Sequence, residues 1–280
     1  MSYLISASKA YERLHDSNTV FADVRFVLGQ PSAGEEAYRL GHIPGAVFFD
    51  LNHDLSGPKE EHGGGHPLPD ADLFALKLGQ AGIDEHTEVI VYDDQGGSIA
   101  SRLWWMLKHA GHERVKLLAD GFSGWQASGF PVTTEIAQPA AKRFIPRVND
   151  SLQATIEEVK AGIGAGNRVL MDSRIHGRYT GEDTSKYLKA GHIPGAINHY
   201  WEDGSPEGVF LDAAHQRERF KSIPLDREII VYCGAGVTAC PNVLALTEAG
   251  YTDVKLYVGS WSDWTSYDEN PVATGEEGKA

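Results

Sequence analysis

Cysteine is scarce in this chain, which has only two, Cys233 and Cys240, among 280 residues. Two cysteines provide no disulfide framework, so the sequence predicts a protein of a reducing, cytoplasmic compartment. Long apolar runs are missing as well, and no stretch approaches the length of a membrane span. The amino-terminal residues lack the basic region and the apolar run of a secretory signal peptide. These absences argue against a secreted or membrane-spanning protein.

Basic side chains are outnumbered by acidic ones, with 25 Lys and Arg against 39 Asp and Glu and a net charge of −14. A chain this acidic offers no basic stripe to neutralise phosphates, so we expect no nucleic-acid partner and no anionic membrane surface. The hydrophobic content of 41% and the charged content of 23% are ordinary for a globular protein. The length of 280 residues predicts two domains rather than one.

The most informative segment is the one around Cys233. Residues 228–232 form an apolar run typical of a buried strand, and Gly234 and Gly236 follow the cysteine before an expected helix at 237–248. A cysteine in such a turn has an exposed sulfur that faces successive backbone N–H groups and the positive end of a helix dipole. These conditions favour the thiolate, which is the nucleophilic form. The alternative is a buried structural cysteine, but a packed core position does not need the flanking glycines.

An internal duplication is the second strong feature of the sequence. The segment Gly-His-Ile-Pro-Gly-Ala occurs unchanged at 41–46 and 191–196. Three further segments recur in the same order: 22–25 as 171–174, 89–92 as 229–232, and 115–117 as 254–256. A Gly and a Trp follow both copies of the third segment, Gly121 and Trp125 in the first half and Gly259 and Trp264 in the second. The shared order indicates a tandem duplication, with extra residues of the first half at 52–69.

Each half alternates short apolar runs with helical patterns, which predicts two tandem α/β domains. Each domain is expected to have a central, mostly parallel sheet with helices on both faces. In the second half we expect strands near 169–171, 196–198, 229–232 and 254–256, and helices near 156–161, 215–221 and 237–248. The expected domains are 1–138 and 150–274, joined by a linker at 139–149, and the tail from 275 is expected to be mobile.

The first half lacks the nucleophile. Alignment on the shared Val-Tyr places Asp93 opposite Cys233, and a carboxylate cannot replace a thiolate as a sulfur nucleophile. The chemistry is therefore expected in the second half, with the first half as a scaffold and as one wall of a ligand-binding cleft.

The duplication, the two Gly-His-Ile-Pro-Gly segments and the turn Cys233-Gly-Ala-Gly-Val-Thr-Ala resemble the two-domain sulfurtransferases of the rhodanese superfamily over nearly the whole chain. The resemblance implies two tandem rhodanese-like domains, of which only the second is catalytic. It implies a sulfane sulfur carried from 3-mercaptopyruvate or thiosulfate to a thiophilic acceptor as a Cys233 persulfide. The acceptor would be cyanide, a small thiol or a thioredoxin-like protein, and no cofactor is expected. The active-site loop would be Gly234, Ala235, Gly236, Val237 and Thr238.

An anionic sulfur donor requires a fixed cation, and Arg174 and Arg178 are the candidates from the sequence. The resemblance points to Arg178 as the substrate-binding residue. Arg174 has an equivalent, Arg25, in the half without the thiol, so we expect it to pair with an acid such as Asp172 instead. The histidines of both Gly-His-Ile-Pro-Gly segments are expected to be structural for the same reason.

Two first-half residues join the candidate site through the resemblance alone. Arg102 matches an arginine that family members place at the substrate site, the alternative being a solvated helix arginine. His66 matches the histidine of the family's His-x-Leu-Pro segment, which has been proposed to assist proton transfer. Together with His53 and His62 it has no metal-ligand spacing, so no metal is expected.

The sequence departs from the family pattern at two places. Ala235 stands where relatives specific for 3-mercaptopyruvate carry a hydroxyl, and a second substrate arginine is absent, with Lys186 as a weak substitute. The uncharged turn disfavours thiosulfate, and the two losses disfavour strict use of 3-mercaptopyruvate. A thiosulfate-preferring enzyme therefore remains the alternative.

Cysteine-dependent phosphatases share the strand–turn–helix geometry, but they need an arginine at the end of the turn, and Ala239 stands six residues after Cys233. A noncatalytic sulfur-relay or regulatory module is the alternative of another class, which the retained thiol and glycines disfavour. Cys240 is expected to be a buried helix cysteine, the alternative being a resolving thiol.

Overall fold

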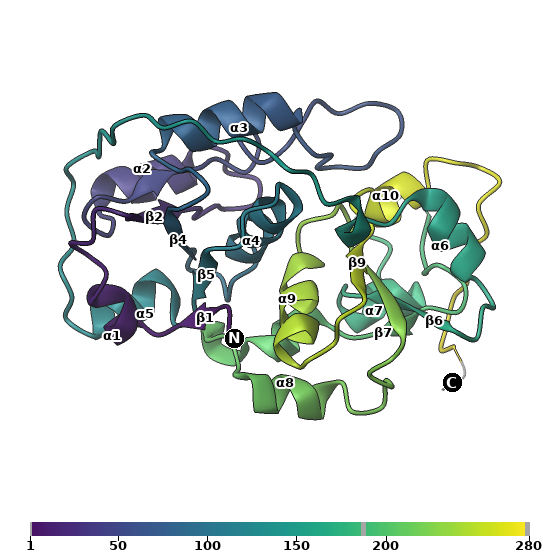
Figure 1. Cartoon of the computed structure of the whole chain (residues 1–280). Coiled ribbons are helices and arrows are strands. Elements are labelled where there is room, and N and C mark those ends of the chain that lie inside the picture. Colours follow the sequence, from purple (N-terminus) through teal and green to yellow (C-terminus); the bar gives the residue numbers. More distant parts are fainter. Residues whose placement is uncertain (1, 186–188, 278–280) are drawn as a thin grey trace. The chain divides into compact units, whose positions relative to one another are not determined.

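The computed structural model describes residues 2–185 and 189–277, which form two compact units (Figure 1). Unit 1 contains the described residues up to 57 together with 68–149 and 205–212. Unit 2 contains 58–67 and the described parts of 150–204 and 213–277. Each unit therefore takes one short segment from the other half of the sequence. The expected boundaries at 138 and 150 stay a prediction.

Unit 1 is built on a five-stranded parallel sheet flanked by helices, with the strand order β1-β5-β4-β2-β3. Its strands are β1 (Leu4–Ile5), β2 (Thr19–Asp23), β3 (Val47–Phe48), β4 (Glu88–Tyr92) and β5 (Val115–Leu118). Its helices are α1 (Ala7–Tyr11), α2 (Ala33–Leu40), α3 (Ala71–Gln80), α4 (Ala100–His109) and α5 (Gly121–Ala127), and a 3₁₀ turn, η3, spans Pro206–Gly208.

Unit 2 repeats this plan with a four-stranded parallel sheet in the order β7-β6-β8-β9. Its strands are β6 (Arg168–Asp172), β7 (Ile197–Asn198), β8 (Glu228–Tyr232) and β9 (Val254–Leu256). Its helices are α6 (Ile156–Gly162), α7 (His176–Thr180), α8 (Ala213–Arg219), α9 (Cys240–Glu248) and α10 (Ser260–Trp264), with the 3₁₀ turns η1 (Asp150–Leu152) and η2 (Trp201–Gly204).

The central strand of each sheet is buried on both faces, which explains its continuous apolar run. In β8, Ile230 and Tyr232 belong to a core cluster with Trp261 and Trp264, whereas the alternating Val231 points to the opposite face. The equivalent cluster of unit 1 contains Ile90 and Tyr92 of β4, Phe122 and Trp125. Trp261 and Trp264 are thus core residues of unit 2.

All four strands expected in the second half are present, and the fold class is confirmed. The helix expected at 237–248 is shorter, because α9 begins only at Cys240 and residues 234–239 form the turn. Pro241 occupies the second position of α9, where a residue without an N–H is tolerated because the first N–H groups have no partner inside the helix.

The beginning of the carboxy-terminal tail, expected to be mobile, is held by hydrogen bonds up to residue 277. Gly275 N–H donates to the Thr180 carbonyl at 2.8 Å, and Gly195 N–H donates to Glu277 Oε1 at 2.9 Å. Within the described residues, no helix is long and apolar enough to cross a membrane.

Candidate active site

Cys233 lies directly after β8, at the start of the turn that leads into α9. The sequence predicted an exposed sulfur, but the residue is only 1% exposed. The turn is closed by hydrogen bonds to α10: Trp261 N–H donates to the Cys233 carbonyl and Ser262 N–H to the Gly234 carbonyl, both at 3.0 Å. The start of α10 therefore covers the cysteine.

The structure explains why position 236 of the turn is a glycine. Its φ is +83°, in the left-handed region, and a Cβ at this position would lie 2.1 Å from the Val258 carbonyl oxygen. Only glycine allows the turn to pass so close to the segment before α10.

Ser260, which the sequence analysis missed, is the side chain that contacts Cys233. Its Oγ accepts a hydrogen bond from Cys233 N–H at 3.1 Å and lies 3.9 Å from Cys233 Sγ. The same Oγ lies 2.9 Å from the Tyr257 carbonyl. A hydroxyl has one proton, so Ser260 donates either to this carbonyl or to the sulfur.

Ser260 also has a strained backbone, with φ +56° in the left-handed region that disfavours residues with a side chain. Its structural counterpart in unit 1 is Gly121, since Phe122 N–H donates to the Asp93 carbonyl as Trp261 N–H does to that of Cys233. Sequence comparison had paired Gly121 with Gly259, one residue away. A serine that replaces a left-handed glycine was the signal that could have revealed Ser260.

Cys240 is the first residue of α9 and is fully buried. Its Sγ lies 3.6 Å from the Gly236 carbonyl oxygen, so the thiol contacts the turn from the helix side. The expectation of a buried helix cysteine is confirmed.

The turn after β4 in unit 1, which occupies the place equivalent to the Cys233 turn, binds a carboxylate. The buried carboxylate of Asp93 accepts four backbone N–H groups: Oδ1 those of Gln95 and Gly97, and Oδ2 those of Ile99 and Ala100, at 2.9–3.0 Å. The turn is therefore an anion-binding nest that the carboxylate of its own chain occupies.

Arg178, the expected donor-binding residue, lies on α7 with its Nε 3.1 Å from Asp183 Oδ2. Ser185 donates to the same carboxyl group through its hydroxyl and its N–H. These hydrogen bonds, and after them the contact with Arg178, lower the pKa of Asp183 to about 2. The arginine is thus paired with an acid in this structure. Lys186 lies outside the described residues.

The two first-half candidates lie in different units. Arg102 belongs to α4 of unit 1, is fully buried and donates from Nη2 to the Leu55 carbonyl at 3.3 Å, so the alternative of a solvated helix arginine is wrong. His66 is half-buried and lies in the segment 58–67, which is part of unit 2. It therefore belongs to the same unit as Cys233.

The residues shared by both halves have structural contacts. Arg174 pairs with Asp172, with 2.5 Å between Nη2 and Oδ2, and also donates to the Gly191 carbonyl. His192 is buried, its ring stacks on Tyr179 at 3.9 Å, and its Nδ1 lies 2.7 Å from the Tyr179 carbonyl. Among the described residues, no group of three or more His, Cys, Asp or Glu side chains is arranged to hold a metal ion.

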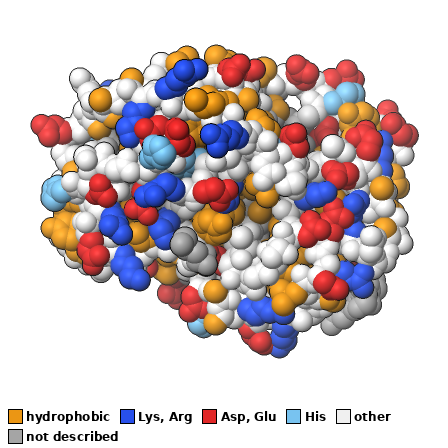
Figure 2. Space-filling view, viewed as in Figure 1, with side chains coloured by type: hydrophobic (Ala, Val, Ile, Leu, Met, Phe, Trp, Pro, Cys, Tyr) orange, Lys and Arg blue, Asp and Glu red, His pale blue; other side chains and the backbone are white. Residues whose placement is uncertain are grey.

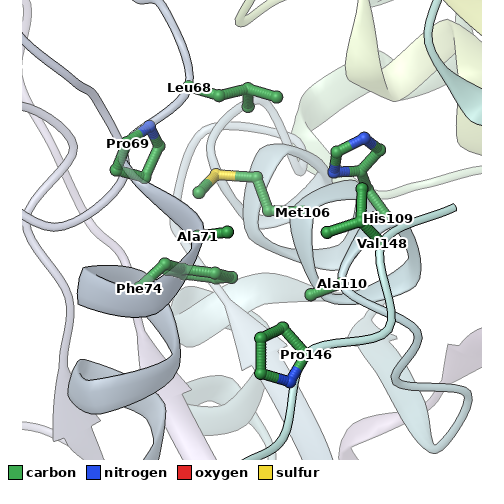
Figure 3. Close-up of a pocket in the computed structure, with 9 residues that line it drawn as sticks. All are labelled: Leu68, Pro69, Ala71, Phe74, Met106, His109, Ala110, Pro146 and Val148. Atoms are coloured by element: carbon green, nitrogen blue, oxygen red, sulfur yellow. The ribbon is translucent and has the colours of Figure 1, made fainter. Parts of the chain in front are cut away.

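A separate small cavity of about 50 Å³ lies in unit 1 between α3, α4 and the segment before residue 149 (Figure 3). Apolar side chains such as Phe74, Met106 and Val148 line it together with His109, whose ring stacks on Trp105. It contains neither a thiol nor an arginine, so it is no candidate for sulfur chemistry.

On the molecular face shown in Figure 2, acidic and basic side chains are interspersed.

Comparison with known proteins assigns the family. The model of the rhodanese-like domain matches residues 6–128 and again 155–267. The chain is 38% identical to a probable 3-mercaptopyruvate sulfurtransferase of Pseudomonas aeruginosa, over 98% of both chains. It is 35% identical to a thiosulfate sulfurtransferase of Gallus gallus, over 82% of this chain and 80% of the relative.

A solved structure agrees with these relatives. The crystal structure of SseA from Escherichia coli, which represents the 3-mercaptopyruvate sulfotransferases, has a TM-score of 0.83 and 30% sequence identity. The match covers 94% of this chain and all of SseA. The chain therefore belongs to the tandem rhodanese-domain sulfurtransferases of the 3-mercaptopyruvate/thiosulfate type.

Proposed function

We propose that this sulfurtransferase works by a ping-pong mechanism in which Cys233 is the nucleophile and carries the sulfur as a persulfide. The observation that carries the proposal is the pair of equivalent turns. In unit 1 the turn binds an anionic side chain through four N–H groups, and in unit 2 the same position is a cysteine with a serine hydroxyl 3.9 Å from its sulfur. A turn that binds an anion favours the thiolate and the persulfide anion alike.

The reaction has two steps. The Cys233 thiolate attacks the thiol sulfur of 3-mercaptopyruvate or the outer sulfur of thiosulfate. The bond that joins this sulfur to carbon in 3-mercaptopyruvate, or to the second sulfur in thiosulfate, breaks. The electron pair leaves on the pyruvate enolate, which takes up a proton, or on sulfite. In the second step the acceptor attacks the outer sulfur of the persulfide and Cys233 leaves as the thiolate. With cyanide the product is thiocyanate.

The turn residues Gly234, Ala235, Gly236, Val237 and Thr238 would supply N–H groups to the sulfur. Arg178 would bind the donor anion once its guanidinium exchanges Asp183 for the donor, which is possible because the side chain is 31% exposed. Arg102, His66 and Lys186 are proposed donor-site residues from the family resemblance alone, as are the acceptor classes. A cytoplasmic location and the domain limits 1–138 and 150–274 are proposed on the sequence.

The side chains around the turn bear on the choice of donor. The methyl group of Ala235 supplies neither the charge that would favour a dianion nor a hydroxyl that could help to protonate an enolate. We propose that 3-mercaptopyruvate, a monoanionic carboxylate, is the preferred donor, with thiosulfate as the alternative.

The test is a comparison of initial rates with 3-mercaptopyruvate and with thiosulfate, with cyanide as the acceptor, for the wild type and Cys233→Ser. We expect a higher kcat/KM with 3-mercaptopyruvate and a loss on the order of 10⁴-fold or more in the variant, because no other residue replaces the nucleophile. A folded Cys233→Ser protein with substantial activity would refute the role of Cys233. A wild type that takes up sulfur from neither donor would favour a noncatalytic module.

A further inference from the structure

A segment from the first half of the sequence lies against the turn that holds Cys233. Residues 62–65, His-Gly-Gly-Gly, are part of unit 2 and contact α10 and the turn. We call these four residues the glycine clasp. The catalytic turn of the second half is thus bounded by residues that precede it by about 170 positions.

The clasp is anchored at its first two residues. The His62 ring stacks on Tyr267 at 4.0 Å with an interplanar angle of 9°, and its Nδ1 lies 2.7 Å from Ser266 Oγ. Gly63 N–H donates to Asp263 Oδ1 at 2.7 Å, and Asp263 is 6% exposed. A hydrogen bond to a buried carboxylate is stronger than one between neutral groups, so this end is firmly held.

The next two residues approach α10 and the turn so closely that a side chain does not fit. Gly64 has φ +86°, and a Cβ there would lie 2.3 Å from the Gly259 carbonyl oxygen. Gly65 donates its N–H to Ser262 Oγ at 3.0 Å, and a Cβ there would lie 2.8 Å from the Cβ of Ala235. The backbone of Gly65, unlike that of Gly64, is not in the left-handed region.

These contacts reach Cys233 by two routes. Ala235 is the second residue after the cysteine, so a shift at its Cβ moves the backbone of the turn itself. Gly259 precedes Ser260, whose Oγ accepts the Cys233 N–H. The clasp therefore bounds both the turn and the serine that define the surroundings of the sulfur.

We propose that the glycine clasp positions the turn for sulfur transfer, and that Gly65 is required because only a residue without a side chain leaves Ala235 in its place. This inference rests on the proposed role of Cys233. Gly65 is a positioning residue that acts on the reaction through the turn.

The experiment compares Gly65→Ala with a matched control, Gly166→Ala. Gly166 lies in the same unit, its φ is likewise outside the left-handed region, and a Cβ there would meet no atom within 4 Å. Two quantities are measured for each variant: kcat and KM with both donors, and the rate of Cys233 alkylation by iodoacetamide as a function of pH. The pH profile reports on the turn, and a purely structural loss of stability would not move it.

Gly65→Ala is expected to lower kcat about tenfold and to shift the pH midpoint of alkylation. A misplacement of about 1 Å can cost about 100-fold in a positioned site, and the shift expected here is smaller. The double variant Gly65→Ala/Ala235→Gly should recover most of the rate, since it removes the Cβ that the new methyl group meets. Gly166→Ala should behave as the wild type.

The outcomes separate this inference from the proposed function. Wild-type kcat and a wild-type pH profile in Gly65→Ala would overturn the role of the clasp while leaving Cys233 as the nucleophile. A Gly65→Ala defect that Ala235→Gly does not relieve would overturn the contact with Ala235 as its cause. An inactive wild type would instead reject the proposed function.

Discussion

The turn after β4 and the turn after β8 occupy equivalent places in their units and end at the first residues of α4 and α9, Ala100 and Cys240. In unit 1 the first residue of the turn, Asp93, satisfies four backbone N–H groups with its own carboxylate. In unit 2 the first residue is the thiol of Cys233, and under the proposed function its thiolate would accept such N–H donors. The two turns share their place in the fold and a left-handed glycine, Gly96 or Gly236, but Gly97 of unit 1 is also left-handed whereas Val237 is not. The turn of unit 1 stabilises the fold, and we propose that the turn of unit 2 serves the chemistry.

The first residue of the helix that covers each turn also differs between the two units: it is Gly121 of α5 in unit 1 and Ser260 of α10 in unit 2. Gly121 of unit 1 adopts φ +61° at little cost, whereas Ser260 of unit 2 adopts φ +56° with a side chain. The strained residue provides the hydroxyl beside the sulfur. The strained residue of unit 2 thus lies beside Cys233, the proposed nucleophile, and Gly121 of unit 1 carries no such strain.

Asp93→Asn tests whether the carboxylate holds the turn of unit 1 together. An amide nitrogen would face two N–H donors that the carboxylate now satisfies, so we expect a loss of about 3 kcal/mol in the free energy of unfolding of unit 1. Chemical denaturation of the full chain measures it, and Glu12→Gln, an exposed acid of the same unit, is the control. A loss below about 1 kcal/mol would mean that the carboxylate does not hold the turn together.

The second variant, Ser260→Gly, places a glycine beside the Cys233 turn at the position that Gly121 occupies in unit 1. It removes the hydroxyl and relieves the left-handed strain, so kcat/KM should fall about tenfold while the stability of unit 2 stays within about 1 kcal/mol of the wild type. Ser260→Ala separates the two effects, because it loses the hydroxyl and keeps the strain. If Ser260→Gly keeps full activity, the hydroxyl has no part in the reaction.

The smallest effect concerns equivalent lysines of β5 and β9. Lys255 Nζ lies 2.7 Å from Glu158 Oε1 and 2.9 Å from Glu228 Oε1, whereas Lys116 contacts only the Ser2 carbonyl among the described residues. The hydrogen bond from Lys255 lowers the pKa of Glu158 below its ordinary value of 4.5. Stability from this pair is therefore present above that value and is lost as the pH falls through the lower pKa of the folded state.

Lys255→Ala should accordingly destabilise unit 2 by about 0.5–1 kcal/mol at pH 7 and by less in acid, since the pair is partly exposed. Lys116→Ala should have no such pH dependence. Denaturation curves at pH 7 and in acid measure both variants. Equal losses for Lys255→Ala at the two pH values would exclude the ion pair as the cause.

Much of the protein could be predicted from local sequence patterns. The apolar runs give the strands of unit 2, and the repeated Gly-His-Ile-Pro-Gly segments give the duplication. The sequence predicted that Arg174 pairs with an acid and does not bind the donor, because its equivalent occurs in the half without the thiol. The structure shows the pair with Asp172. The start of α9 was misplaced by three residues because the turn uses residues that also suit a helix.

Strand periodicity, turn glycines and a repeated order of segments are all read from neighbouring residues, so the fold class, the tandem arrangement and the candidate nucleophile followed from the sequence. The burial of Cys233, the position of Ser260 beside its sulfur and the contact of the glycine clasp with the turn are visible only in the folded chain. Clasp hydrogen bonds join residues 197–204 positions apart. Contacts over such separations depend on the packing of whole elements, so no local pattern specifies them.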